Sequence, residues 1–183
     1  MDMGLLRRRN ALIGKVDTYT MLYPDAYMIA FDCNANTTFQ FMYEYKIIRY
    51  ILDGKEKVLS IGVNGVTPTT SGTHILYFWL NGSTRLSDKN WSGGPKYLRI
   101  TGEVTNWHGA FVHNVGDLSR IDFTGTTPPY FSSDFGNHLP KISEIRVPIG
   151  TKAAYVTALS KAGKDIKNKS SIIIETNDFS YNV

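Results

Sequence analysis

Residues 117–147 read DLSRIDFTGTTPPYFSSDFGNHLPKISEIRV and contain two copies of one apolar pattern. The matching apolar residues lie 24 residues apart: Leu118 and Ile142, Ile121 and Ile145, Phe123 and Val147. In each copy a polar residue, Asp122 or Arg146, separates the last two apolar residues, which is typical of a short strand with one buried face. A short strand followed by a turn-rich return, repeated at this period, is the pattern of a leucine-rich repeat. The stretch therefore predicts stacked strands, because one such unit cannot bury its apolar face alone.

A third, approximate copy lies upstream, in Tyr97–Ile100. Ile100 precedes Phe123 by 23 residues. The segment between them, Trp107–Phe111, would be the return arm, with Trp107, Ala110 and Phe111 capping the core. The alternative is that these segments are three ordinary strands of an irregular β domain.

The repeat region resembles a known family. Ser119–Pro129 and Ile145–Tyr155 are similar to the closing repeat of the BspA-like leucine-rich-repeat proteins of Bacteroidetes. Three features carry the resemblance: a loop with Thr127-Pro128-Pro129, a strand ending in Val147-Pro148-Ile149-Gly150, and a following helix with Tyr155. The resemblance is specific over about residues 97–159. It implies a short leucine-rich-repeat unit, although the chain has few repeats and no repeated Asn or Cys in the turn.

An antiparallel β unit is predicted before the repeats, over about residues 28–86. Phe39–Tyr45 alternates aromatic with mostly polar residues, as a half-buried strand does. Asp53-Gly54 predicts a tight hairpin turn between this strand, continued to Leu52, and a returning strand at Lys57–Ile61. His74–Leu80 is a further, nearly continuous apolar strand. Gly72–Phe78 also resembles an element that precedes the repeats in BspA-like proteins.

The C-terminal segment predicts a cap for the repeats. Thr151 can cap a helix over Lys152–Ala162. The helix residues expected to face the core are Ala153, Val156, Leu159 and Ala162, and Gly163 is the expected stop. Ser171–Glu175 predicts a last strand that covers the open edge of the stack. Phe179 and Tyr181 would continue that contact or reach a neighbouring subunit.

These segments together predict a mainly β fold: a small antiparallel β-sandwich-like domain, then a short leucine-rich-repeat-like β unit capped by one C-terminal helix and strand. The predicted divisions are an N-terminal anchoring arm at 1–27, the antiparallel β domain at 28–90 and the repeat-like domain with its capping helix at 91–183. The boundary between the last two falls in the loop-rich stretch 81–96, which contains Asn-Gly-Ser and Ser-Gly-Gly-Pro.

Composition narrows the class of protein. With 183 residues, 42% of them hydrophobic, the chain can bury a core of its own. The net charge of +4 is mildly basic and by itself does not favour a nucleic-acid partner. The single cysteine, Cys33, excludes an intrachain disulfide and a Cys-based zinc site. No apolar run approaches the ~18 residues of a membrane helix, and the apolar run after Arg9 is shorter than that of a secretory signal.

Chemistry-bearing motifs are sparse. His108 and His113 are five residues apart without an H-E-x-x-H or comparable ligand pattern, and His74 is expected to be a partly buried structural residue. The carboxylates are scattered, so a glycosidase-like pair is neither favoured nor excluded. The sequence predicts no catalytic residue, no metal site and no cofactor. Trp91 and Trp107 are the candidates for surface recognition of a carbohydrate or protein, with core packing or a subunit interface as the alternative.

The N-terminal segment predicts an anchoring arm without regular structure. Its candidate anchors are apolar and basic: Leu5, Leu6, Arg7, Arg8, Arg9, Leu12 and Ile13. Apolar side chains can dock on a partner, and Arg side chains can bind carboxylates or phosphates. Gly4–Gly14 resembles the openings of virion proteins of phages that infect Bacteroidetes. The alternative is a solvated tail.

The sequence thus predicts a non-enzymatic structural component of a bacteriophage virion, anchored by its N-terminal arm. A head fibre, an auxiliary capsid protein and a tail-associated protein all fit. The expected partners are other virion proteins and further copies of the chain, with a trimer as one option, and a host surface glycan or protein as another. Nucleic acid and membrane are not expected. The alternative is a BspA-like bacterial adhesin or ligand-binding surface protein, and a carbohydrate-active enzyme is a third option without a motif.

Overall fold

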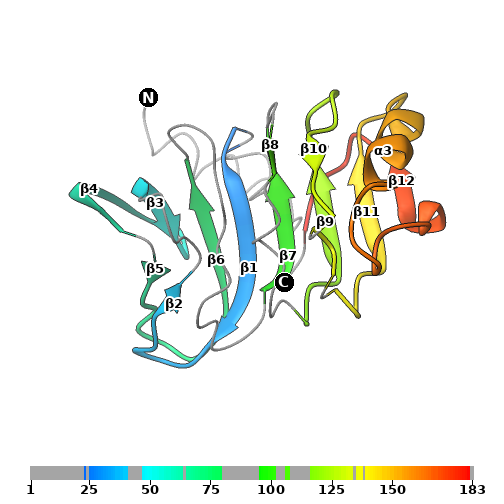
Figure 1. Ribbon diagram of the computed structural model, residues 1–183. Helices are drawn as coiled ribbons and strands as arrows, with labels where there is room; N and C mark the ends of the chain where they lie inside the picture. The colour runs from blue at the N-terminus through cyan, green and yellow to red at the C-terminus, as the bar shows by residue number, and fades with distance from the viewer. Residues whose placement is uncertain are drawn as a thin grey trace.

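The computed structural model describes residues 23, 25–40, 47–63, 65–79, 95–101, 106–107, 116–133, 135–137 and 139–181. These residues form a mainly β protein built on an eight-stranded mixed sheet (Figure 1). The order of its strands across the sheet is β12 (Ile173–Glu175), β11 (Glu144–Val147), β9 (Arg120–Phe123), β7 (Pro95–Ile100), β1 (Tyr27–Cys33), β6 (Gly72–Phe78), β3 (Ile47–Leu52) and β4 (Lys55–Val63). The mainly β prediction is confirmed.

Two small ladders and two short helices complete the described structure. The ladders pair β10 (Tyr130–Phe131) with β8 (Asn106–Trp107), and β2 (Phe39–Gln40) with β5 (Gly65–Val66). The helices are α3 (Lys152–Leu159) and the 3₁₀ turn η2 (Ser170–Ile172), both at the β11–β12 end of the sheet (Figure 1). Within the described residues, no helix has both the length and the apolar character of a membrane span.

The strand register reproduces the sequence repeat. β9 and β11 pair in parallel with Ile121 opposite Ile145, so the predicted 24-residue offset is confirmed. β7 pairs in parallel with β9, and Ile100 lies opposite Phe123, which confirms the approximate copy upstream. The return arms stack as well, since Phe131 of β10 lies opposite Trp107 of β8 in parallel. Each unit is therefore one coil of a stack. The strands β7, β9 and β11 form one side of the stack, and the return strands β8 and β10 form the other side.

The core lies between these two sides. The repeated apolar residues are almost completely buried: Leu118, Ile121, Phe123, Ile142, Ile145 and Val147. Phe131 and Phe135 from the return side pack in the same cluster. In the last coil α3 takes the place of a return strand, and its Tyr155 donates a buried hydrogen bond to the carbonyl of Gly125 (2.8 Å). The helix therefore closes the stack through a tyrosine as well as through Leu159.

The antiparallel strands and the repeats share one sheet. β1 pairs antiparallel with β6 on one side and with β7 on the other, so the hydrogen-bonding groups of both its edges are used. The antiparallel strands predicted as a sandwich-like unit therefore continue directly into the parallel strands. The sheet runs across the predicted boundary between residues 90 and 91, while the division into domains remains a prediction.

The hairpin prediction at Asp53-Gly54 is confirmed. Both residues have positive φ, 49° and 76°, and they join β3 to β4 with Leu52 opposite Lys55. Such angles suit a two-residue hairpin loop. The Asp53 carboxylate also bonds to the ring Nδ1 of His74 (2.8 Å) and accepts from the backbone N–H of Ile75 (3.0 Å). His74, only 3% exposed, is therefore a structural residue, as predicted.

The C-terminal cap differs in detail from its prediction. α3 ends at Leu159, and Thr151 makes no side-chain cap because its hydroxyl donates to the carbonyl of Pro148 (2.7 Å). The Glu175 carboxylate of β12 instead accepts from the backbone N–H of Lys152 (2.9 Å). Ala153, expected in the core, is exposed, and Tyr155 is buried in its stead. The face of α3 that is buried is the one that contacts β10 and β12, and helical spacing alone does not reveal which face that is.

Gly163 is required by close packing. A Cβ atom built on it would lie 2.6 Å from the backbone nitrogen of Asn137. Its own N–H donates to the carbonyl of Phe135. The segment after α3 therefore lies against the 135–139 loop, and this contact, more than helix termination, explains the glycine.

Acid sensitivity follows from a contact between the two halves of the sheet. Asp32 of β1 pairs with Lys96 of β7 (2.7 Å) and accepts from the Thr73 hydroxyl (2.6 Å), and these hydrogen bonds lower the pKa of Asp32. A lowered pKa means that the folded state favours ionised Asp32, so the stabilisation is present above the unfolded pKa and is lost as the pH falls through the folded pKa. Asp32→Asn should therefore flatten the decrease in unfolding free energy between about pH 5 and pH 2. The difference should be under about 1 kcal/mol, because both side chains are nearly half-exposed. Urea titrations at each pH measure it, and identical slopes for the two proteins would contradict it.

Candidate functional site

The face of the parallel strands opposite the repeat core carries mainly polar side chains. Strand alternation places on it Tyr97 and Arg99 of β7, Arg120 and Asp122 of β9, Glu144 and Arg146 of β11, and Ile174 of β12. We call these seven residues the polar face. The register aligns them in two rows across the strands, Tyr97–Arg120–Glu144 and Arg99–Asp122–Arg146–Ile174. Neighbouring side chains in a row can therefore pair directly.

Asp122 is the centre of the polar face. It is completely buried, and its carboxylate accepts hydrogen bonds from Nε and Nη2 of Arg120 (2.8 and 2.6 Å) and from the hydroxyl of Tyr97 (2.7 Å). The Arg120 guanidinium also lies 5.3 Å from the centre of the Tyr97 ring. A buried carboxylate with this many charge-assisted donors is fixed in orientation, and it in turn fixes Arg120 and Tyr97.

Burial dominates the ionisation of this cluster. Burial raises the pKa of Asp122, although the hydrogen bonds and charge of Arg120 act in the opposite direction. Burial also raises the pKa of the Tyr97 phenol, and the charge of Asp122 adds to that effect. Burial would lower the pKa of Arg120, but the hydrogen bond and charge of Asp122 outweigh it and raise that pKa. Tyr97 and Arg120 are therefore held as hydrogen-bond donors.

The C-terminal segment crosses back over the polar face. Nη1 of Arg146 donates to the carbonyl of Asp178 (2.9 Å), and the ring of Tyr181 stacks on that of Tyr97 with centroids 4.0 Å apart. The Asp178 carboxylate accepts from the N–H of Ser180 (3.0 Å), and hydrogen bonding to Ser180 lowers the pKa of Asp178. Tyr181 was expected at the end of the stack or against another subunit, but it lies on β7, three strands from β12.

A groove of about 460 Å³ lies between this segment and the strands. Its lining is polar: Ser119, Arg120, Ser143, Glu144, Arg146, Asp178, Ser180 and Tyr181. The hydroxyls of Ser119 and Ser143 donate to backbone carbonyls (3.1 and 3.2 Å), which leaves their oxygens as acceptors. Two guanidinium groups face two carboxylates. The groove therefore offers donors and acceptors with balanced charge, which suits a neutral, hydroxyl-rich ligand or a peptide backbone.

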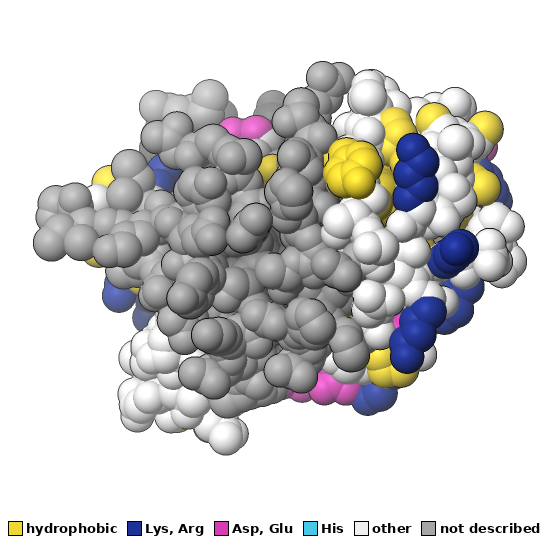
Figure 2. Space-filling model, viewed as in Figure 1, with side chains coloured by type: hydrophobic (Ala, Val, Ile, Leu, Met, Phe, Trp, Pro, Cys, Tyr) yellow, Lys and Arg dark blue, Asp and Glu magenta, His cyan; other side chains and the backbone are white. Residues whose placement is uncertain are grey.

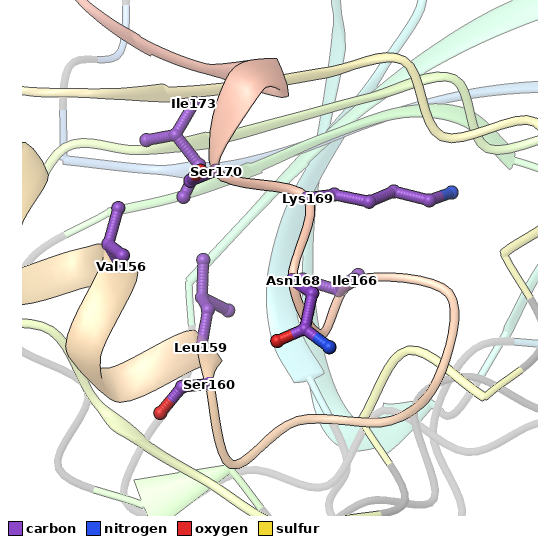
Figure 3. Close-up of a pocket in the computed structure, with 8 residues that line it drawn as sticks. All are labelled: Val156, Leu159, Ser160, Ile166, Asn168, Lys169, Ser170 and Ile173. Carbon is purple, nitrogen blue, oxygen red and sulfur yellow. The ribbon is translucent and has the colours of Figure 1, made fainter.

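A second hollow, of about 260 Å³, lies at the end of the stack (Figure 3). Three core residues, Leu159, Ile166 and Ile173, and the partly buried Val156 form the apolar part of its lining. Ser160, Asn168, Lys169 and Ser170 form the polar part. We call this hollow the end pocket. It combines an apolar interior with hydrogen-bonding groups and one cation, as binding pockets commonly do.

The residues predicted as sites fall largely outside the described part of the chain. The arm residues Leu5, Leu6, Arg7, Arg8, Arg9, Leu12 and Ile13 lie there, as do Trp91, His108 and His113. Trp107 has its backbone in β8, and its side chain lies outside the described residues. Among the residues that are described, no group of three or more His, Cys, Asp or Glu could hold a metal ion.

Sequence reasoning found only part of the polar face. The same alternation that predicts Asp122 and Arg146 to point away from the core also predicts this for Arg120 and Glu144, which lie two residues earlier in the two strands. No local signal pairs Tyr181 with Tyr97, or places Lys169 beside Leu159 in the end pocket. Those contacts depend on the path of the chain after the last strand.

Comparison of the chain with protein-family models, with curated proteins and with solved structures found no match.

Proposed function

We propose that the chain is a binding and assembly protein, a structural component of a bacteriophage virion that its N-terminal arm anchors to the particle. The observation that carries the proposal is the parallel stack with 24- and 23-residue offsets, closed by α3 and β12. A stack of this kind is a rigid body whose faces and ends serve as docking surfaces. The similarity of Gly4–Gly14 to virion-protein openings supplies the anchoring role. The body would then be the head-fibre, auxiliary capsid or tail-associated part.

A second candidate is a ligand-binding surface protein of the BspA-like type. The polar groove favours it, because its balanced donors and acceptors suit recognition of a glycan or peptide. The two candidates differ in the role of the arm: an assembly part needs the arm to reach its place, whereas a recognition protein needs the polar face.

Removal of residues 1–19 tests the anchoring role. We expect the shortened protein to melt within about 3 °C of the full chain, because an arm that docks on the particle would add little to the core of the free chain. The arm of the full chain should be cut first by a protease at low concentration, as an undocked segment is. Differential scanning calorimetry, limited proteolysis and light scattering measure these properties.

The control for this experiment is Arg146→Ala, which removes a contact of the C-terminal segment and leaves the arm intact. Loss of the cooperative transition on removal of residues 1–19 would show that the arm is part of the core. The anchoring role would then fail, and the ligand-binding candidate would be the better account.

A further inference from the structure

Four lysines lie in one segment at the end of the stack: Lys161, Lys164, Lys167 and Lys169. Three of them are exposed and Lys169 is half-buried. In the part of the chain that is described, none of the four forms an ion pair. The one carboxylate of the segment, Asp165, accepts from the backbone N–H of Leu139 (2.8 Å) and so serves the loop contact. The segment therefore presents positive charge that no described neighbour neutralises.

The same positive character is visible on the surface. Figure 2 shows Lys and Arg side chains spaced along the right side of the molecule, over the end of the sheet where α3 lies, with few acidic side chains among them. A concentration of one sign of charge attracts the opposite sign and speeds encounter with it. The end of the stack is thus suited to an anionic partner.

The end pocket is lined in part by this basic segment. Lys169 is part of its lining, and Lys161 and Lys167 directly follow the lining residues Ser160 and Ile166. Figure 3 shows Val156, Leu159 and Ile173 grouped on one side of the pocket, with Lys169 on the other side and its side chain extending away from them. At about 260 Å³ the pocket is smaller than the ~300–1,000 Å³ of pockets for drug-sized ligands, so it fits a single apolar side chain better than a whole ligand.

We propose that the end of the stack binds an acidic segment of a partner protein. An apolar side chain of that segment enters the end pocket, and flanking Asp or Glu residues pair with Lys167 and Lys169. An aliphatic or aromatic anchor in a pocket with a charged rim is the usual arrangement of a binding hot spot. This surface uses no residue of the N-terminal segment 1–27, so it adds a second partner to the assembly role proposed above.

A second copy of the chain fits this surface poorly. The opposite edge of the sheet is β4, where Lys55 and Lys57 are exposed and Glu56 already pairs with Arg49 (2.9 Å). Head-to-tail contact of two copies would bring lysines toward lysines, which disfavours association. A nucleic acid would use the lysines for its phosphates and would leave the apolar pocket unfilled. An acidic protein segment uses both features.

A labelled peptide with one leucine between two pairs of glutamates tests the proposal. Its binding to the full chain is followed by fluorescence anisotropy. Lys167→Glu/Lys169→Glu should weaken binding by about tenfold or more, because two attractive charges become repulsive. The matched control is Lys55→Glu/Lys57→Glu, which makes the same change of charge with the same spacing on β4 and should alter binding less than about twofold.

The pocket has its own variant and its own probe. Ser170→Trp, at an exposed position on the rim, should block the pocket and weaken peptide binding while every lysine remains. A peptide with serine in place of leucine should bind correspondingly less well to the unchanged chain. Both results would support an apolar anchor.

Three results would overturn the proposal. The first is equal loss in both double-lysine variants, which means that only net charge matters. The second is no peptide binding at up to about 1 mM. The third is stronger binding of single-stranded DNA or phosphatidylserine vesicles with the same dependence on Lys167 and Lys169, which identifies a nucleic acid or a membrane as the partner. Both double-lysine variants keep the same arm, so the difference between them tests the end of the stack, and failure here is distinct from failure of the anchoring role.

Discussion

Asp122→Ala should lower the free energy of unfolding by about 3–5 kcal/mol, the usual cost of removing one partner of a buried ion pair. The substitution leaves the Tyr97 hydroxyl and the Arg120 guanidinium without the carboxylate that accepts from both, in a place where Asp122 itself has no exposed surface. The cost arises because both donors lose their acceptor in a buried place where water cannot replace it. Urea unfolding at neutral pH measures it.

Two variants make this result specific. Asp122→Asn keeps an acceptor for Tyr97 and removes the charge. Its free energy of unfolding should therefore lie between those of the wild type and Asp122→Ala. Asp117→Ala removes an exposed partner of Lys141 and should cost less than about 1 kcal/mol, since both side chains are more than half-exposed. If Asp122→Ala unfolded at the same urea concentration as Asp117→Ala, the central role of Asp122 would be wrong.

Ile145→Ala should cost about 2–5 kcal/mol, because it opens a cavity in the middle of the repeat core. Ile145 has no exposed surface and lies opposite Ile121 on one side and Ile173 on the other. The side chain therefore packs against two neighbouring coils, and its loss should weaken the stack on both sides. Chemical denaturation followed by far-ultraviolet circular dichroism measures the change.

Ile174→Ala is the matched control, with the same change of side chain on the adjacent strand. Ile174 is 45% exposed and lies on the polar face, so its truncation should change the unfolding free energy by less than about 0.5 kcal/mol. Equal costs at the two positions would mean that the strands do not alternate between core and surface in the register described.

The repeats could be predicted from the local spacing of apolar residues. The 24-residue spacing of Ile121 and Ile145 survives in the structure because parallel strands with identical faces bury most apolar surface when equivalent residues lie side by side. The Asp53-Gly54 turn was predictable for a different reason: positive φ at two consecutive residues restricts which side chains fit. Both signals lie within a short stretch of chain.

The candidate sites were less accessible to the sequence. Alternation in β9 and β11 marks which side chains leave the core, but it does not say whether they meet solvent or another segment. Arg146 meets Asp178 and Tyr97 meets Tyr181 only because the chain turns back after β12. The end pocket likewise needs α3, the segment after it and β12 in one place.

The sequence by itself therefore determined the mainly β class, the coil-by-coil repeat and its register, because these follow from the spacing of apolar residues along a few dozen positions. Only the tertiary structure decided that β1 lies between β6 and β7 and joins the antiparallel and parallel strands in one sheet. It also decided that Glu175, not Thr151, caps α3. The physical reason is that such contacts join residues that are distant in sequence. Their pairing depends on the burial and hydrogen bonding of the whole fold, so no periodic pattern within one segment predicts it.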